Sequence, residues 1–386
     1  MKSRNLNLYL VAVLILMATV LLLDRRFLPA RSPISRFNPT NAELISTVMN
    51  LIKNDYLEEP NPVRIGEGAF RGLVNSLDPL SAYLDRDLGN RYLNQKAPVR
   101  DTGLVLYKKY GLFPVVVTVR ENSPAAEAGL KVGDAISAIN DRNTMNMSLL
   151  EVQLLLQADP KVSGPQPVKL RIVRGSDTLE KEIQRNFIFQ ESCSMTAGPS
   201  GLVIVHPSAV YEGVSELIRK QLQARLRTQP RPKAVVLDLR NCWLGSMEEA
   251  REIINLFIKD SEAAFIQARD RKQPLSCSDS PAFPELKLFI WVNQATAGAA
   301  EVVAGVLKDL NRAKVIGLET PGLAGLQETF PLSDGSVVVL TTAVYTLKSG
   351  TRLWENPVPL DAKLTYSEKI DQAYLEKTKE MLSSGN

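Results

Sequence analysis

Four short apolar runs between residues 195 and 365 limit the fold of this chain more than any other feature. They alternate with longer stretches that have the apolar periodicity of helices. Strands that alternate with helices in this way predict a mixed sheet with helices packed on its faces. The expected strands are residues 201–205, 234–239, 286–292 and 314–317, and the expected helices are residues 210–226, 247–258 and 299–310.

Residues 100–188 have a different pattern, in which β-rich runs alternate with Gly and Asn turns around one helix at residues 149–157. The string SPAAEAGLKVGDAISAIN at residues 123–140 resembles the most recognisable stretch of a PDZ domain. A PDZ domain binds a peptide as an added strand and holds its C-terminal carboxylate with backbone N–H groups. The resemblance assigns this peptide-binding role to the loop Gly103, Leu104, Val105 and Leu106.

One residue of that loop departs from the resemblance. Val105 stands where the family usually has a second glycine, which predicts weaker capture of a carboxylate. The other interpretation of the loop is a strand that only closes the small barrel.

The N-terminal segment contains an apolar run at residues 8–23, with Lys2 and Arg4 before it and Arg25 and Arg26 after it. No small-residue cleavage site follows the run, so an uncleaved signal anchor is favoured over a cleaved signal peptide. We expect a single-pass anchor in the cell membrane, with the bulk of the chain on the periplasmic or extracellular side.

Helix signals set the other boundaries. Thr40 and Glu43 have the spacing of a capping box, and so do Thr365 and Glu368 before the last expected helix. The fold class that follows is a multidomain α/β protein. Its expected parts are residues 1–38 (signal anchor and spacer), 39–99 (small helical segment), 100–188 (β-rich PDZ domain), 189–366 (mixed α/β core) and 367–386 (C-terminal helix).

Composition argues against several classes of chemistry. His206 is the only histidine, so a histidine-based catalytic pair would have to use it, and its place after an apolar run favours a structural role. The cysteines Cys193, Cys242 and Cys277 form no CxxC motif, and a Cys193–Cys277 disulfide stays open for an oxidising compartment. Scattered basic residues with a net charge of +4 argue against nucleic-acid binding. No metal and no cofactor are expected.

Three motifs of the α/β part resemble, in order and spacing, those of the C-terminal processing peptidases. They are LDLRNCWLG at residues 237–245, TAGAAE at 296–301 and GLETPGLAGLQ at 317–327, and LDPLSAYL at 77–84 resembles a fourth stretch of the family. The resemblance implies a peptidase-like core with a sheet of the crotonase or ClpP type. It also implies a serine nucleophile and a lysine base, whose desolvated amine takes the serine proton without a histidine.

The chain departs from this pattern at the residues that would do the chemistry. Gly298 stands at the nucleophile position, Leu323 at the lysine position and Leu244 at a glycine of the oxyanion turn. Asp309 and Glu301 match the family, and both are interpreted as structural because no nucleophile remains for them to assist. We therefore expect a pseudopeptidase of the serine-type peptidase fold, with no intact catalytic residue.

Two residues are candidates for a replacement nucleophile. Thr296 carries the nearest hydroxyl, whereas Cys242 is more simply explained as a small buried residue that fills space in the core. The favoured function is binding of peptides or protein C-terminal tails in the cell envelope, where the chain regulates or scaffolds an active peptidase or an envelope complex. The alternative is an active C-terminal processing peptidase, a serine-type endopeptidase with a nonstandard nucleophile. The third interpretation is a purely structural assembly protein whose PDZ domain binds no peptide.

Overall fold

The computed structural model describes residues 39–95, 99–243, 245–260, 262–277 and 280–384. The chain divides into two compact units, residues 1–66 and residues 67–386. The apolar run expected to form an anchor, residues 8–23, lies outside the described residues. Within the described ranges, no helix is long and apolar enough to cross a membrane.

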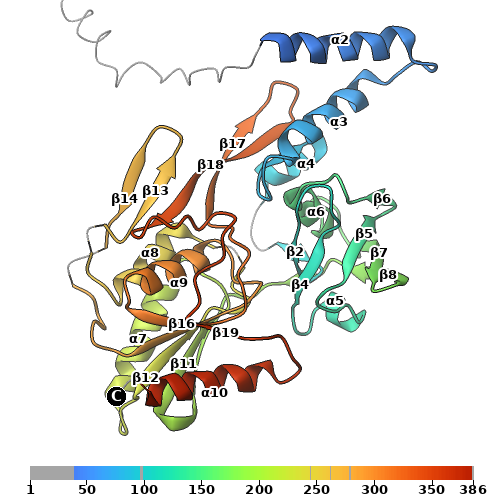
Figure 1. Ribbon diagram of the computed structural model, residues 1–386. Helices are drawn as coiled ribbons and strands as arrows, with labels where there is room; N and C mark the ends of the chain where they lie inside the picture. Colours follow the sequence, from blue (N-terminus) through green and yellow to red (C-terminus); the bar gives the residue numbers. More distant parts are fainter. Residues whose placement is uncertain (1–38, 96–98, 244, 261, 278–279, 385–386) are drawn as a thin grey trace, which may run out of the picture. The chain divides into compact units, whose positions relative to one another are not determined.

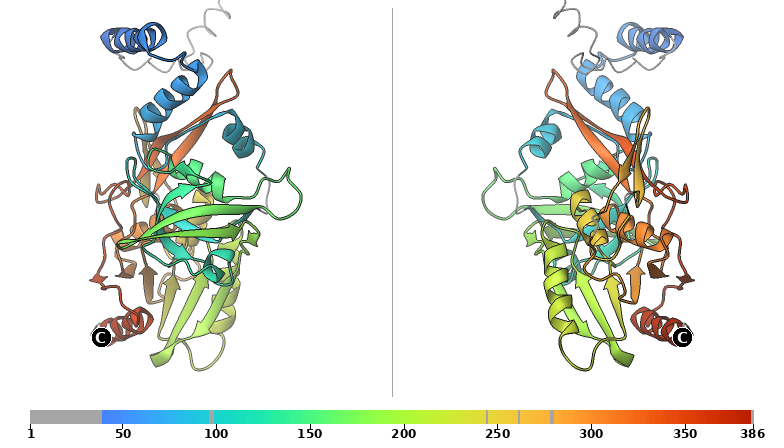
Figure 2. Two further views of the ribbon diagram at one scale, coloured as in Figure 1. Left: turned by 90° about the vertical axis from the view of Figure 1, so that its right-hand side faces the viewer. Right: turned by 90° about the vertical axis from the view of Figure 1, so that its left-hand side faces the viewer.

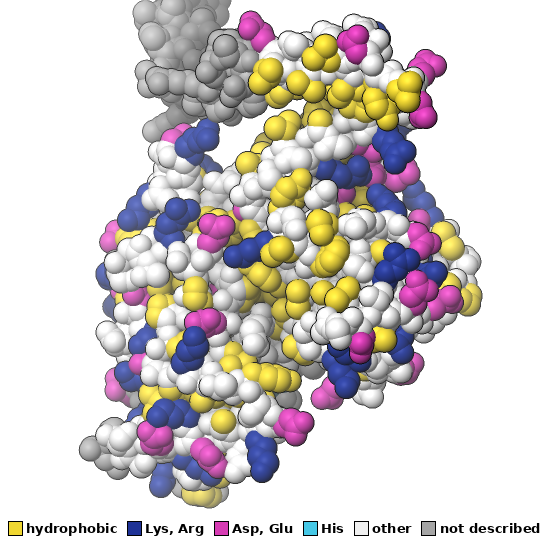
Figure 3. Space-filling view, turned by 45° about the vertical axis from the view of Figure 1, so that its right-hand side comes forward, with side chains coloured by type: hydrophobic (Ala, Val, Ile, Leu, Met, Phe, Trp, Pro, Cys, Tyr) yellow, Lys and Arg dark blue, Asp and Glu magenta, His cyan; other side chains and the backbone are white. Residues whose placement is uncertain are grey.

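The first unit contains α2 (Pro39–Asp55) and the beginning of α3 (Pro62–Asn75), which agrees with the helices expected there. The apolar residues Leu44, Val48 and Leu51 of α2 are exposed. These and neighbouring apolar side chains form a stripe along α2 in the space-filling view (Figure 3).

In the second unit, residues 100–188 form the β-rich domain that the sequence predicts (Figure 1). Its sheet has the order β3-β4-β5-β7-β8, with β6 (Arg142–Asn143) paired to β5, and every one of these pairings is antiparallel. The strands are β3 (Leu104–Tyr107), β4 (Val115–Val119), β5 (Ala135–Ile139), β7 (Pro167–Arg174) and β8 (Asp177–Gln184), and the helices are α5 (Pro124–Glu127) and α6 (Leu149–Leu156). A short pair, β2 (Arg100–Asp101) and β9 (Phe187–Ile188), closes the domain at its ends.

The core is built on a six-stranded sheet of order β10-β11-β12-β15-β16-β19. Only β10 (Cys193–Ala197) is antiparallel to its neighbour. The parallel strands are β11 (Leu202–Pro207), β12 (Ala234–Asp238), β15 (Leu288–Val292), β16 (Ala313–Gly317) and β19 (Ala362–Lys363). The expected mixed α/β architecture is therefore confirmed.

Both faces of this sheet are covered, which explains why its central strands β12 and β15 are almost entirely apolar. Side chains alternate between the faces: Val235 and Leu237 of β12 pack under one set of helices, whereas Val236 packs on the opposite side. Three helices cover the first face and one covers the second (Figure 1, Figure 2). They are α7 (Val214–Leu226), α8 (Met247–Asn255) and α9 (Ala299–Asp309) on the first face, and α10 (Ile370–Ser383) on the second.

The beginning of α10 corrects one expectation. The helix starts at Ile370, four residues after the Thr365–Glu368 spacing predicts, and no side chain caps its first turn. Its position is set by tertiary contacts instead: the Tyr374 hydroxyl donates to the carbonyl oxygen of Val292 at 2.6 Å. Contacts with the sheet thus override the local capping signal.

A second sheet of five strands was not anticipated. Its order is β1-β18-β13-β14, and β17 also pairs with β18, so the long β18 is its centre. Because β1 and β18 are more than 250 residues apart in the chain, this sheet ties the N-terminal part of the second unit to the core. The strands are β1 (Ala82–Leu84), β13 (Ala264–Ala268), β14 (Lys272–Leu275), β17 (Gly325–Pro331) and β18 (Val337–Leu347).

Candidate functional site

The three sequence motifs meet at one edge of the parallel sheet. Strands β12, β15 and β16 are adjacent and parallel, with Asp238 opposite Trp291 and Val292 opposite Gly317. The chain leaves all three strands at their carboxyl ends, which is where open α/β sheets place their functional loops. The motifs that the sequence analysis singled out therefore form one site.

Two of the three loops are joined by a pair of asparagines. The Asn241 backbone N–H donates to the Asn293 side-chain oxygen at 3.0 Å, and the Asn293 amide donates back to Asn241 Oδ1 at 2.9 Å. The Ala297 N–H also donates to the carbonyl oxygen of Cys242 at 3.0 Å. These bonds hold the turn after β12 against the loop that leads into α9.

Gly298, at the nucleophile position, is the residue that precedes α9. Its backbone has φ 62° and ψ −116°, a sharp strand-to-helix turn of the kind on which nucleophile elbows present a side chain. Here the turn presents none, because glycine has no side chain. The backbone of an elbow is kept, and the reactive group is absent.

Glu301 connects Gly298 with Leu323, the two residues that the sequence resemblance places at the nucleophile and base positions. Its carboxylate is fully buried and accepts from the N–H groups of Gly298 at 3.0 Å, Gly322 at 2.6 Å and Leu323 at 2.7 Å. Burial raises the pKa of Glu301 to about 7, while a hydrogen bond from the Thr320 side chain and the backbone N–H groups oppose that rise. Glu301 is the third residue of α9 and accepts from the N–H of the N-cap residue Gly298, and a glutamate at this helix position was a usable sequence signal for such a contact.

Leu323, at the base position, is 2% exposed and forms a backbone bridge with Trp354. A hydrocarbon side chain cannot take a proton, so this buried place has no general base. Neither Leu323 nor Gly298 lines any of the cavities described below.

The oxyanion turn is described except at Leu244, which lies outside the described residues. Its neighbour Gly245 has φ 140°, and a Cβ there would lie 2.6 Å from the carbonyl oxygen of Val210. Only glycine fits that close approach of two backbones. Trp243, on the other side of Leu244, packs against the apolar core of the PDZ domain.

The two replacement nucleophiles are engaged in the fold. Thr296 is fully buried, and its hydroxyl donates to the carbonyl oxygen of Leu239 at 2.9 Å. Cys242 is also fully buried, its thiol donates to the carbonyl oxygen of Pro207, and burial raises its pKa above the usual thiol value. A thiol held in the protonated form is a poor nucleophile, so neither residue is placed to replace a serine.

His206 and Asp309 lie away from Gly298. The His206 ring nitrogen Nδ1 is 3.1 Å from the carbonyl oxygen of Asp238. Asp309 is eleven residues after Gly298 on one helix, about 16 Å along its axis, and accepts from the Ser349 N–H at 3.0 Å. Both have structural partners.

The remaining expectations concern thiols and metals. Cys193 and Cys277 are free thiols, and burial raises the pKa of each to about 11. Over the described ranges, no three His, Cys, Asp or Glu side chains are grouped closely enough to hold a metal ion.

The PDZ loop lies beside a cavity of about 270 Å³. Gly103 has φ 81°, and a Cβ on it would lie 2.2 Å from Ser123, so the turn into β3 requires glycine. Strand β3 pairs only with β4, which leaves its other edge free for an added strand. The cavity is lined by Asp101, Thr102, Gly103, Leu104, Val105, Leu106, Arg120, Gln153, Leu156, Gln157, Phe187, Phe189 and Trp243.

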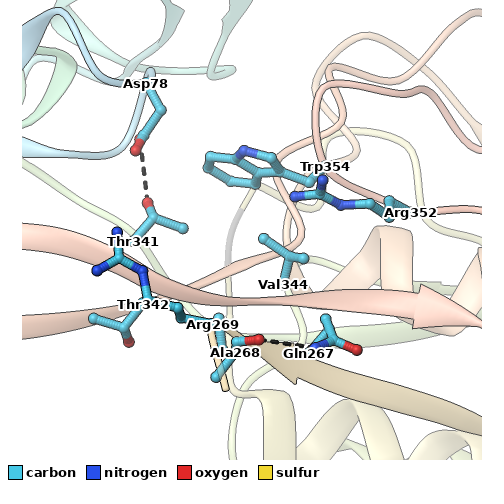
Figure 4. A pocket seen from close by; sticks show the side chains of 10 residues that line it. Asp78, Gln267, Ala268, Arg269, Thr341, Thr342, Val344, Arg352 and Trp354 are labelled. Atoms are coloured by element: carbon cyan, nitrogen blue, oxygen red, sulfur yellow. Dashed lines mark hydrogen bonds between the residues drawn. The ribbon is translucent and has the colours of Figure 1, made fainter. Parts of the chain in front are cut away.

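A second cavity, of about 340 Å³, lies at the second sheet (Figure 4). It is bordered by Trp354 and Val344 and by the guanidinium groups of Arg269 and Arg352. Asp78, from the LDP motif, accepts a hydrogen bond from the Thr341 hydroxyl at 3.1 Å on one side of it. The cavity offers apolar and cationic contacts.

Comparison with known proteins gives the following relationships. Residues 208–364 match the model of peptidase family S41, and residues 115–174 match that of the PDZ domain. A carboxy-terminal-processing protease of Bartonella bacilliformis is 28% identical over 318 residues, which cover 79% of this chain and 71% of that protein. A probable CtpA-like serine protease of Staphylococcus aureus is 27% identical over 339 residues, covering 86% of this chain and 66% of that protein. The chain thus spans just under two thirds of the staphylococcal relative.

The solved structure of a photosystem II D1 C-terminal processing protease has the same fold. It superimposes with a TM-score of 0.65 at 22% identity, over 83% of this chain and 86% of that one. The two matched domains, the relatives and the arrangement of the three motifs agree. In its PDZ match, its S41 match and its fold, this chain is similar to the C-terminal processing peptidases.

Proposed function

We propose that this chain is a pseudopeptidase that binds peptides or protein C-terminal tails without cutting them. The observation that supports this most is the identity of the two residues that Glu301 holds in place, Gly298 and Leu323. One lacks a side chain and the other is a buried hydrocarbon. The main-chain frame of a catalytic dyad is kept, while both reacting groups are missing.

The binding half of the proposal rests on the PDZ domain. The free edge of β3 and the adjoining cavity have the geometry in which a peptide is added as a strand. Val105 is buried, and a valine does not give the loop the backbone freedom that a second glycine would give. Capture of a carboxylate therefore needs hydrogen-bond donors from outside the loop.

The site of action and the partners belong to the same proposal. The apolar run at residues 8–23 supports a membrane anchor, and the relatives are named as processing proteases. We infer a place in the cell envelope, where the chain binds tails and thereby regulates or scaffolds an active peptidase.

A cleavage assay tests the catalytic half. The purified chain is incubated with an unfolded substrate that carries a defined C-terminal tail, and fragments are followed by mass spectrometry. We expect no cleavage by the wild type. Turnover that disappears in Thr296→Ala or Cys242→Ala would show an active peptidase with a nonstandard nucleophile and would overturn the proposal.

Tail binding is tested separately on the same chain, by pull-down with immobilised peptides that end in a free carboxylate. Gly103→Val places a side chain on Ser123 and should abolish capture, whereas Val105→Gly should preserve or increase it. Capture that Gly103→Val leaves unchanged would place the peptide elsewhere and would favour a purely structural role for the PDZ domain.

A further inference from the structure

The cavity beside the PDZ loop is not formed by the PDZ domain alone. Trp243 lines it, although this residue belongs to the turn after β12 of the peptidase-like core. The contact is not incidental, because Trp243 also packs against the buried apolar residues of the PDZ domain. A residue of the former oxyanion turn has become one wall of the peptide groove.

Three donors at this cavity have no acceptor within the described part of the chain: the Thr102 hydroxyl, the Trp243 indole N–H and the Arg120 guanidinium. The indole N–H of Trp243 is buried and makes no hydrogen bond. The Arg120 guanidinium lies 4.2 Å over the ring of Phe189, and among the described residues no carboxylate is within 4.0 Å of it. A buried donor without an acceptor is destabilising, and natural sites that retain one commonly receive their acceptor from a ligand.

Arg120 is also held close to the peptide-binding loop. Its backbone N–H donates to the carbonyl oxygen of Gly103 at 2.9 Å, so the side chain starts beside the turn where a terminal carboxylate would end. Burial lowers the pKa of Arg120, and the nearby Asp101 carboxylate opposes that shift. A second anion close to the guanidinium would favour its charged form further.

We propose that Arg120 and Trp243 complete the tail-binding site of this chain. The Arg120 guanidinium pairs with the terminal carboxylate of a bound peptide, and the Trp243 indole packs against the last side chain and donates its N–H to the ligand. The ligand is a peptide with a free C-terminal carboxylate. This inference rests on the proposed function, and it supplies the donors that a loop with Val105 in place of glycine lacks.

Two structural consequences follow. The indole N–H is closed off from solvent in this structure, so the ring must turn for a ligand to reach it. The site is also composite, since it exists only while the PDZ domain contacts the core. That contact includes a hydrogen bond of 2.8 Å from the Thr118 hydroxyl of β4 to Asn241, two residues before Trp243.

An array of decapeptides tests the inference. The peptides share one spacer and differ in their last two residues, and each is made with a free carboxylate and as the amide. The full chain is applied, and the dissociation constants of the best free peptide and of its amide are then measured. The wild type should prefer the free peptide.

The variants Arg120→Met and Trp243→Phe should each weaken binding of the free peptide by about tenfold or more, the typical effect of losing a hydrogen bond to a charged group. They should leave binding of the amide nearly unchanged, so that the preference collapses. Arg120→Lys, which keeps the positive charge, should retain part of the preference for the free peptide over the amide. Arg142→Met, an exposed arginine of β6, is the matched control and should behave as the wild type.

The outcomes separate the two proposals. A wild type that binds no peptide, or binds amides as well as free peptides, contradicts the proposed capture of tails. A wild type that prefers free carboxylates with an unchanged preference in Arg120→Met and Trp243→Phe contradicts only the present inference. A variant that loses affinity for both forms equally, with a lower unfolding temperature, shows a structural role and also overturns it.

Discussion

Replacing Glu301 by glutamine tests whether one buried carboxylate holds the frame of the former active site. Its two oxygens accept from three backbone N–H groups and from the Thr320 side chain. An amide offers one acceptor oxygen and turns an NH₂ group toward the remaining donors. At about 1–3 kcal/mol for each buried donor left without an acceptor, the loss should be about 2–5 kcal/mol.

The pH dependence of this loss gives a second, independent readout. A pKa of about 7 in the folded chain, against 4.5 for an unperturbed glutamate, means that folding favours the protonated form. The stability from this group is therefore fully present below about pH 4.5 and is lost as the pH rises through 7, by roughly 3 kcal/mol in all. Glu301→Gln does not titrate and lacks this slope, so the difference in unfolding free energy between the variant and the wild type should change by roughly 3 kcal/mol between low pH and pH values above 7.

Urea unfolding followed by tryptophan fluorescence at pH 5 and at pH 8 measures both effects. Glu248→Gln, on the exposed side of the neighbouring α8, serves as the control for removing a carboxylate and should change little. If Glu301→Gln unfolds at the same urea concentration as the wild type and with the same pH slope, the carboxylate does not hold these loops.

Three further substitutions probe the supports of the same site. Arg240→Met removes a guanidinium that stacks 4.6 Å over Tyr374 and pairs with the carboxylates of Asp238 and Asp371. The amide hydrogens of α10 should then exchange faster. Unchanged exchange in α10 would contradict this anchoring. Gly317→Ala would place a Cβ 1.9 Å from the carbonyl oxygen of Val292 and should cost about 3 kcal/mol or more in urea unfolding. Asn241→Ala breaks the bond between the turn and β4, and limited proteolysis should then cut the segments flanking the PDZ domain sooner than in the wild type.

The parallel core could be predicted from the sequence because its signals are local. Each strand is buried on both faces and therefore reads as a continuous apolar run, as β12 and β15 do. The second sheet escaped prediction for the opposite reason. Strand β17 exposes polar residues along its length, and β1 has only three residues, so their pairing depends on partners distant in the chain.

The candidate site was predictable to the same degree. Fixed motif spacing predicted that Gly298 and Leu323 belong to one site, and the structure places the backbone N–H groups of both on the Glu301 carboxylate. The function of Glu301 could not be predicted, because one of the N–H groups from which it accepts belongs to a loop 21 residues further along the chain. The position of Trp243 could not be predicted either, since its contacts depend on how the PDZ domain packs against the core.

The backbone at Gly298 has a consequence for how such a chain evolves. A side chain at φ 62° and ψ −116° is strained by about 1–3 kcal/mol, and an active enzyme must tolerate that strain to present its nucleophile. Glycine relieves it. Once selection for turnover ends, the exchange of serine for glycine is therefore favoured by stability itself, and a protein under selection only for binding would retain it. Catalysis can then be lost from such a site as an adaptation of the fold rather than as its decay.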